Sequence, residues 1–239
     1  MSAFYRLLGR RTPGGVVVER DGLVAAVVPT CPNQSVVNGV VYEDARAVRD
    51  AHAELTALYA GAGVGAWRVW VPEADRATAE WLERSGHHLA GSPRAMTLAL
   101  AGLQHQVADD HDCRRVADAA ALSALNEQAY GLPAGEFATA TQALKGHAEF
   151  YFAREHGEFA ACVAALDEGR DCGIYCVATR PSSRGRGLAS ALIRRALSDA
   201  RDRGCTTSSL QSSPSGFHVY ERLGYRDEGA LETWEYRGV

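Results

Sequence analysis

The feature of this sequence that most restricts its fold is an arginine- and glycine-rich turn between a strand-like run and a long amphipathic helix. Residues 172–179 favour a strand, the turn reads Arg184-Gly185-Arg186-Gly187, and apolar residues then recur at helical spacing up to Arg203. A strand, a glycine turn and a helix in this order are typical of a crossover connection in a sheet protein. Because helices and strands also alternate elsewhere, the sequence predicts an α/β protein with a mixed (α+β) sheet.

The remaining elements are predicted from hydrophobic periodicity and from the positions of turn residues. Further helices are expected at residues 44–60, 74–85, 112–130, 136–146 and 216–223. Strands are expected at residues 36–42, 67–71, 96–100, 149–154, 159–166, 172–179, 206–211 and 231–236. The polar run 155–158, Glu-His-Gly-Glu, predicts a tight turn between two of these strands.

Composition and charge exclude several classes of protein. The 239 residues are 46% hydrophobic and have a net charge of −4 without a basic stripe, which argues against a nucleic-acid partner. No apolar run approaches the ~20 residues that span a bilayer. Pro13, Gly14 and Gly15 follow the basic N-terminus where a signal peptide would need an apolar segment. We therefore expect a cytoplasmic protein that does not contact a membrane.

The cysteines and acidic clusters predict no metal site. Six cysteines, at positions 31, 113, 162, 172, 176 and 205, form no C-x-x-C pair, and in a reducing compartment we expect them to be small buried hydrophobic residues. The run 109–112, Asp-Asp-His-Asp, contains metal-ligating residue types. Acidic residues that enter a helix are the commoner explanation for such a run.

Two segments of the chain resemble each other. Residues 81–87, Trp-Leu-Glu-Arg-Ser-Gly-His, parallel residues 219–225, Val-Tyr-Glu-Arg-Leu-Gly-Tyr, and the order of the flanking strands and helices also matches. The segment 102–105 lies between the two halves. We therefore expect two lobes, residues 1–103 and 104–239, of which the first is a shortened copy of the second.

The turn at residues 184–189 has the chemistry of an anion site. Glycines let the backbone approach a phosphate closely, the first amides of the helix have no intrahelical acceptor, and the helix dipole favours negative charge. Arg184 and Arg186 add positive charge. The turn lacks the lysine of a P-loop, and Ser190 replaces the third glycine of a Rossmann fingerprint. A pyrophosphate is the expected ligand; a capping loop with solvated arginines is the alternative.

Two motifs together resemble the GNAT superfamily of acyl-CoA-dependent N-acetyltransferases. Residues 184–189 match the pattern R/Q-x-x-G-x-G/A, and residues 220–225 match a later pattern, Y-E-K/R-x-G-F/Y. The resemblance covers residues 105–239 and implies the GNAT acyl-CoA N-acyltransferase fold. The first lobe is similar, with lower specificity, to the degenerate lobe of tandem-GNAT proteins, so the resemblance implies two GNAT-like lobes with the first truncated.

The resemblance also implies a ligand and a set of binding residues. Acetyl-CoA would be the cosubstrate, without a metal, and would lie between two parallel strands at residues 172–179 and 206–211. The residues implied to bind it are Val177, Thr179, Arg184, Gly185, Arg186, Gly187, Leu188, Ala189 and Ser213. Ser213 departs from the family pattern, in which asparagine is common, and Gly216 stands where alanine is common.

Tyr220 is the predicted catalytic residue. A thiolate leaving group must gain a proton, and a phenol of pKa near ~10 donates one when it lies within about 3 Å. The alternative is a core aromatic residue with its hydroxyl at the edge of the core. In the first lobe Leu82 stands in its place, and residues 42–44, Tyr-Glu-Asp, replace the arginine–glycine turn, so we expect one active site per chain. The candidates for the general base are Asp171, Tyr175, Glu232 and Glu235.

The sequence therefore predicts an N-acetyltransferase that transfers the acetyl group of acetyl-CoA to a primary amine of a small molecule or peptide. The alternative is a non-catalytic acyl-CoA-binding or regulatory module, because no base is evident and Ser213 replaces asparagine. The sequence does not specify the acceptor amine or the acyl-chain preference. It also leaves open whether the chain is a monomer or a homodimer.

Overall fold

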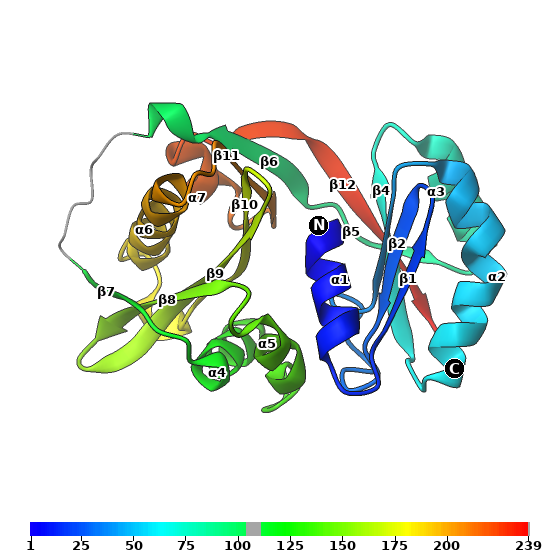
Figure 1. Cartoon of the computed structure of the whole chain (residues 1–239), viewed down its shortest axis with the longest axis horizontal. Helices are drawn as coiled ribbons and strands as arrows, with labels where there is room; N and C mark the ends of the chain where they lie inside the picture. The colour runs from blue at the N-terminus through cyan, green and yellow to red at the C-terminus, as the bar shows by residue number, and fades with distance from the viewer. Residues whose placement is uncertain (104–110, 239) are drawn as a thin grey trace. The chain divides into compact units, whose positions relative to one another are not determined.

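The computed structural model describes residues 1–103 and 111–238, and the chain divides into two compact units. Unit 1 consists of Met1–Arg94 and Gly229–Val239, and unit 2 consists of Ala95–Glu228. Each unit combines helices with a β-sheet that contains both parallel and antiparallel pairs, which confirms the predicted mixed α/β class (Figure 1). The division into lobes at residues 103/104 stays a prediction, and residues 104 and 105 of the expected boundary lie outside the described residues.

Unit 1 is a sheet with helices on both faces. Its elements are α1 (Ser2–Arg11), β1 (Val16–Arg20), β2 (Leu23–Val27), β3 (Gly39–Tyr42), α2 (Ala45–Gly61), β4 (Ala66–Pro72), α3 (Arg76–Arg84), β5 (His88–Gly91) and most of β12 (Arg226–Arg237). The strand order is β1-β2-β3-β4-β12, with β5 also paired to β12. Strands β3 and β4 are parallel, and α2 connects them.

The alternation of side chains along β2 explains why unit 1 needs two layers of helices. Val24 and Ala26 join a cluster with Tyr5 of α1, whereas Leu23 and Ala25 join the cluster that includes α2. Successive residues of a strand point to opposite faces, so every residue of β2 is buried. The sequence analysis missed α1, β1, β2 and β5, because a continuous apolar run and a short basic helix carry little periodicity.

Unit 2 contains the predicted site. Its elements are β6 (Arg94–Ala99), β7 (Asp112–Arg115), α4 (Ala119–Tyr130), α5 (Ala138–Leu144), β8 (Glu149–Glu155), β9 (Glu158–Glu168), β10 (Asp171–Thr179), α6 (Leu188–Asp202), β11 (Thr207–Ser212) and α7 (Phe217–Arg222), with short 3-10 turns at Leu100–Gly102 and Pro181–Ser183. The strand order is β6-β11-β10-β9-β8-β7. Helices α4 and α6 both pack on β9 and β10, from opposite sides (Figure 1).

One predicted helix in unit 2 is wrong at its start. Residues 112–115 are strand β7, paired antiparallel with β8, and not the first turn of a helix. The helix α4 begins after Asp118, whose carboxylate accepts a hydrogen bond from the Ala121 amide (2.9 Å). The polar run 112–118 therefore contains both a strand and a helix cap, a change that helical periodicity does not reveal.

The predicted turn between β8 and β9 is confirmed. It has positive φ at both central residues, His156 (52°) and Gly157 (84°), as tight hairpins require.

The prediction that the six cysteines are buried holds for four of them. All six are free, and Cys113 and Cys176 are only partly buried. Among the described residues, no helix is long and apolar enough to span a bilayer.

The important feature of the sheet in unit 2 is the separation of β10 and β11. These parallel strands pair only from Asp171↔Thr207 to Gly173↔Ser209, although β10 continues to Thr179. Beyond this point β10 contains a bulge between Tyr175 and Ala178, in which Cys176 has a positive φ of 51°. The two strands therefore stop pairing on the side from which the chain enters α6.

Candidate active site

The start of α6 has free main-chain donors. Gly187, with φ of 80°, precedes the helix, and no side chain caps it. The first helical bond joins the Ala191 amide to the Gly187 carbonyl (3.0 Å), so the amides of residues 188–190 have no acceptor within the helix. Gly185 also has positive φ (77°) and has open space where a Cβ would be. This turn presents amides to solvent at the positive end of a helix dipole, which favours an anion.

The arginines of the turn contact protein atoms and are not simply solvated. Arg184 donates to the carbonyls of Ala129 (2.9 Å) and Thr179 (3.3 Å). Arg186 donates to Glu155 (2.9 Å) and to the Ser182 carbonyl (3.3 Å). Both side chains are exposed, so they orient the turn while their charge remains open to an anion in solution.

Glu155 connects the β8–β9 hairpin to this turn. The Ser183 hydroxyl and the Arg186 guanidinium both lower the pKa of its carboxyl group. The carboxylate therefore stays ionised at neutral pH and keeps its ion pair with Arg186. The sequence analysis treated residues 155–158 only as a turn.

The carbonyls predicted to bind the pantetheine arm of the cosubstrate are engaged by side chains. The Val177 carbonyl accepts a hydrogen bond from the Tyr130 hydroxyl (2.9 Å), and the Thr179 carbonyl accepts from Arg184. Thr179 is also opposite Ala161 in the β9–β10 pair. Val177 thus lies in the bulge of β10 and Thr179 lies just after it, and both carbonyls are already hydrogen-bonded.

Tyr220 lies on α7 in the core that α6 also joins. Its side chain is 8% exposed and belongs to the same cluster as Leu188. Its ring packs edge-on against Tyr225 (centroids 5.9 Å apart), and a Cβ at Gly216 would lie only 3.0 Å from the ring, which explains glycine there. Burial, and secondarily the nearby Tyr130, raises the pKa of Tyr220. The phenol is therefore protonated throughout the neutral range and is able to act as an acid.

Two residues of the predicted binding set are limited in what they contact. The Leu188 side chain is 3% exposed and belongs to the core, so only its amide is available to a ligand. Ser213 is exposed after β11, and its hydroxyl is hydrogen-bonded to that of Ser215 (3.1 Å).

The carboxylates considered as bases are occupied. Asp171 accepts hydrogen bonds from Thr207 (2.8 Å) and Ser209 (2.5 Å). Glu232 belongs to unit 1, where it pairs with Arg76 (3.0 Å), and Glu235 belongs to unit 1 as well. Arg237 and Ser35 both hydrogen-bond to Glu235. Each of these carboxylates therefore already has a hydrogen-bond or ion-pair partner within the protein.

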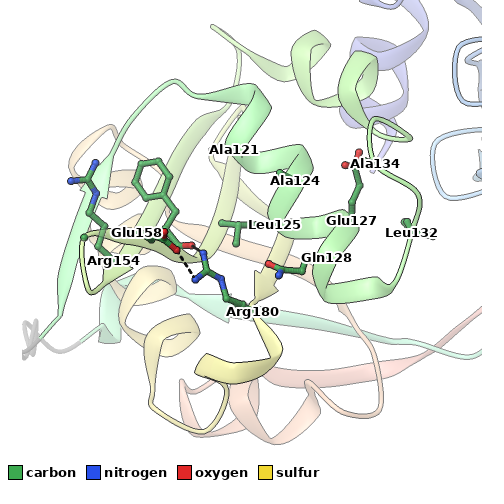
Figure 2. Close-up of a pocket in the computed structure, with 12 residues that line it drawn as sticks. Ala121, Ala124, Leu125, Glu127, Gln128, Leu132, Ala134, Arg154, Glu158 and Arg180 are labelled. Atoms are coloured by element: carbon green, nitrogen blue, oxygen red, sulfur yellow. Dashed lines mark hydrogen bonds and ion pairs between the residues drawn. The ribbon is translucent and has the colours of Figure 1, made fainter.

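A separate cavity of about 640 Å³ lies between α4 and the β8–β9 hairpin (Figure 2). Leu125 and Phe159 supply apolar wall, and Arg180 crosses it to donate to Glu158 (3.1 Å). The Nε atom of Arg180 is buried without a hydrogen-bond partner. Tyr220 and the residues predicted to bind the cosubstrate are not among the lining residues, so this cavity is distinct from the predicted site.

The acidic run before β7 forms no metal site within the described part of the chain. No group of three or more metal-ligating side chains is present among the described residues. Asp112 lies in β7, so the interpretation of this residue as a helix start is wrong, and Asp109 and Asp110 lie outside the described residues. His111 instead donates to the Arg186 carbonyl (2.9 Å), at the same turn that precedes α6.

Sequence reasoning missed the contribution of α4. Asn126 and Tyr130 extend from its second half to the bulge of β10, where they bond to the Cys176 and Val177 carbonyls. The only sequence signal is the pair Tyr130-Gly131, which marks a helix end. It does not reveal which strand the tyrosine contacts.

The arrangement of β10, α6, β11 and α7 defines the class of protein. Solved structures similar in fold include a GCN5-related N-acetyltransferase from Kribbella flavida (TM-score 0.72, 20% identity, covering 100% of this chain and 94% of that chain). Another, from Sphaerobacter thermophilus, has a TM-score of 0.64 at 15% identity and covers 91% of this chain and 81% of that chain. A tandem GNAT protein from the clavulanic acid biosynthesis pathway has a TM-score of 0.63 at 14% identity, and the match covers 95% of this chain and 84% of that chain. The fold is therefore the mixed α/β GNAT fold.

A segment of unit 2 matches a family model. Residues 119–225 match the model of the Acetyltransferase (GNAT) family, whereas no curated protein matches the chain. The matched segment contains both motifs on which the resemblance rests, residues 184–189 and 220–225.

Proposed function

We propose that this chain is an acyl-CoA-dependent N-acetyltransferase that transfers the acetyl group of acetyl-CoA to a primary amine of a small molecule or a peptide. One observation carries the proposal: the uncapped start of α6 lies next to the separating strands β10 and β11 in a unit that also buries Tyr220. The amides of residues 185–189 would bind the diphosphate. The end of β10, at Val177 in the bulge and at Thr179 after it, would bind the pantetheine arm.

The same residues would support direct transfer. The amine nitrogen attacks the thioester carbonyl carbon, a C–N bond forms, and the C–S bond breaks. The Tyr220 hydroxyl gives its proton to the departing thiolate, and the attacking nitrogen loses one proton to solvent or to a base. The phenol is protonated at pH 7, as tyrosine ordinarily is, and the pKa raised by burial keeps the proton on it until the thiolate departs.

We also infer that the first lobe is a degenerate copy of the second, with one site per chain. The end of α3 repeats the end of α7: Leu82 accepts from the His87 amide at 3.0 Å, as Tyr220 accepts from the Tyr225 amide at 3.1 Å. Leu82 is fully buried and has no acidic proton. This repetition supports an origin by duplication followed by loss of the acid.

A non-catalytic acyl-CoA-binding module remains the second candidate. The occupied carboxylates favour it, because Asp171, Glu232 and Glu235 all have other partners. In that case binding would occur without an amine-dependent reaction. An external amine that is already neutral needs no base before it attacks, and solvent can take the proton that the nitrogen then loses, which is why transfer remains our first choice.

The test is to measure CoA binding by calorimetry and free thiol release with acetyl-CoA and a panel of primary amines. Thiol release that depends on one class of amine supports the acetyltransferase. Binding of CoA without release across small amines, amino acids, aminoglycosides and peptides supports the binding module. Absence of CoA binding would contradict both.

A further inference from the structure

The second half of α4 contacts the bulge of β10, where β10 lacks strand partners. The register with β9 shifts between Tyr175 and Ala178, and the pairing with β11 ends at Gly173. The two peptides in the bulge therefore direct their carbonyls to α4. Asn126 donates to the Cys176 carbonyl (3.4 Å), and Tyr130 donates to the Val177 carbonyl (2.9 Å). These side chains therefore supply the two carbonyls with donors in place of a neighbouring strand.

The two donors differ in how easily they could leave. Asn126 is 5% exposed and also bonds to the Leu122 carbonyl within its own helix (2.8 Å). Tyr130 is 62% exposed, is the last residue of α4, and precedes Gly131, whose φ of 67° ends the helix. Rotation about its own side-chain bonds would move the Tyr130 ring into solvent without a change in the backbone.

We propose that Tyr130 is a positioning residue that occupies the Val177 carbonyl in the free enzyme and yields this acceptor to the pantetheine amide of acetyl-CoA. The inference rests on the proposed function, because it assigns the Val177 carbonyl to the cosubstrate. Because the Tyr130 hydroxyl already donates to the Val177 carbonyl, a pantetheine amide would compete with it for this acceptor. Tyr130 thus keeps the strand hydrogen-bonded before binding and lowers the affinity for CoA.

Tyr130→Phe tests this competition. The variant keeps the ring but cannot donate to the Val177 carbonyl. The CoA-free protein therefore loses a hydrogen bond that, on this proposal, the CoA-bound protein does not make. We expect CoA to bind about 2- to 10-fold more tightly by calorimetry. The KM for acetyl-CoA should fall together with the dissociation constant. Tyr130→Ala, which also removes the ring, should bind CoA at least as tightly as Tyr130→Phe.

The matched control is Tyr42→Phe, which removes a hydroxyl bonded to Asp75 (2.6 Å) in unit 1. It should leave the CoA dissociation constant unchanged. An equal or weaker affinity in Tyr130→Phe would overturn the inference, and so would a lower kcat at unchanged KM, which would give the hydroxyl a role in the bound state. If the wild-type chain binds no CoA, the proposed function fails as well; if it binds CoA and the variant does not differ, only the role of Tyr130 fails.

Discussion

The start of α2 in unit 1 and the start of α6 in unit 2 occupy the same place in a strand–helix–strand connection. Both helices join two parallel strands, β3 to β4 and β10 to β11. Asp44 caps α2 by accepting a hydrogen bond from the Arg46 amide (2.9 Å), whereas Gly187 at α6 has no side chain to cap with. In unit 1 the carboxylate of Asp44 accepts a hydrogen bond from an amide at the start of α2. In unit 2 the amides at the start of α6 remain available to an external anion.

The helices that end each repeat differ in a corresponding way. The backbone bonds are nearly the same, since the Gly86 and Gly224 amides donate to Glu83 (3.1 Å) and Glu221 (2.9 Å), respectively. At the position of Tyr220, unit 1 has Leu82 instead. A similar helix end therefore carries the predicted acid in unit 2 only. The variants that follow each alter one element of this contrast.

The largest effect is expected for Tyr220→Phe, which removes the hydroxyl and so makes α7 as inert as α3. The ring and its packing on Tyr225 remain, so folding and CoA affinity should be preserved. Loss of a general acid lowers kcat by about 100- to 10,000-fold. The measurement is amine-dependent thiol release at saturating acetyl-CoA. Full turnover in this variant would remove Tyr220 from the mechanism but would leave the fold assignment intact.

The next effect concerns Gly187→Asp, which gives α6 the carboxylate that caps α2. The carboxylate would accept hydrogen bonds from the free amides at the start of α6 and would repel a diphosphate. CoA affinity should therefore fall by on the order of 100-fold. Gly187→Asn is the matched control, because both residues tolerate positive φ similarly but only aspartate is charged. The aspartate variant should bind CoA more weakly than the asparagine variant. Equal affinities would show that charge at this turn is irrelevant.

Much of this contrast could be predicted from sequence, because it depends on local residue types. The glycines at 185 and 187, Tyr220 and the absence of a tyrosine at position 82 are visible directly. The contacts of Tyr130 and Glu155 could not be predicted, because each joins elements that are far apart in the chain. Strand β7 was mistaken for helix since four polar residues gain a strand conformation only by pairing with β8.

A smaller effect distinguishes His87 from its counterpart Tyr225. Burial lowers the pKa of His87 to about 4, whereas an unfolded histidine titrates near ~6.5. The folded state therefore favours the neutral His87 ring. The contribution of this preference to the free energy of unfolding is fully present above pH 6.5 and is lost as the pH falls toward 4. We expect a loss of about 2 kcal/mol in the free energy of unfolding between pH 7 and pH 5.

Tryptophan fluorescence measures this loss in unit 1, because all four tryptophans (67, 70, 81 and 234) belong to it. Urea titrations at the two pH values would compare the wild type with His87→Gln, which does not titrate. His52, whose Nε2 lies 3.0 Å from that of His87, is unchanged in the variant. The pH-dependent loss should shrink in the variant; an identical loss would assign it to other groups.

The smallest effect is expected for Asp44→Ala, which removes the cap of α2 and leaves its first amides free, as they are in α6. Loss of an N-cap should lower the free energy of unfolding of unit 1 by about 1 kcal/mol, measured by the same urea titration. Asp44→Asn is the control, since asparagine caps equally well, and it should retain wild-type stability. In both variants CoA should still bind at one site per chain, because unit 1 lacks the glycines of the turn and the phenol. Binding of a second CoA to Asp44→Ala would mean that the Asp44 carboxylate alone prevents CoA from binding to unit 1, and that the missing glycines and phenol are not the reason.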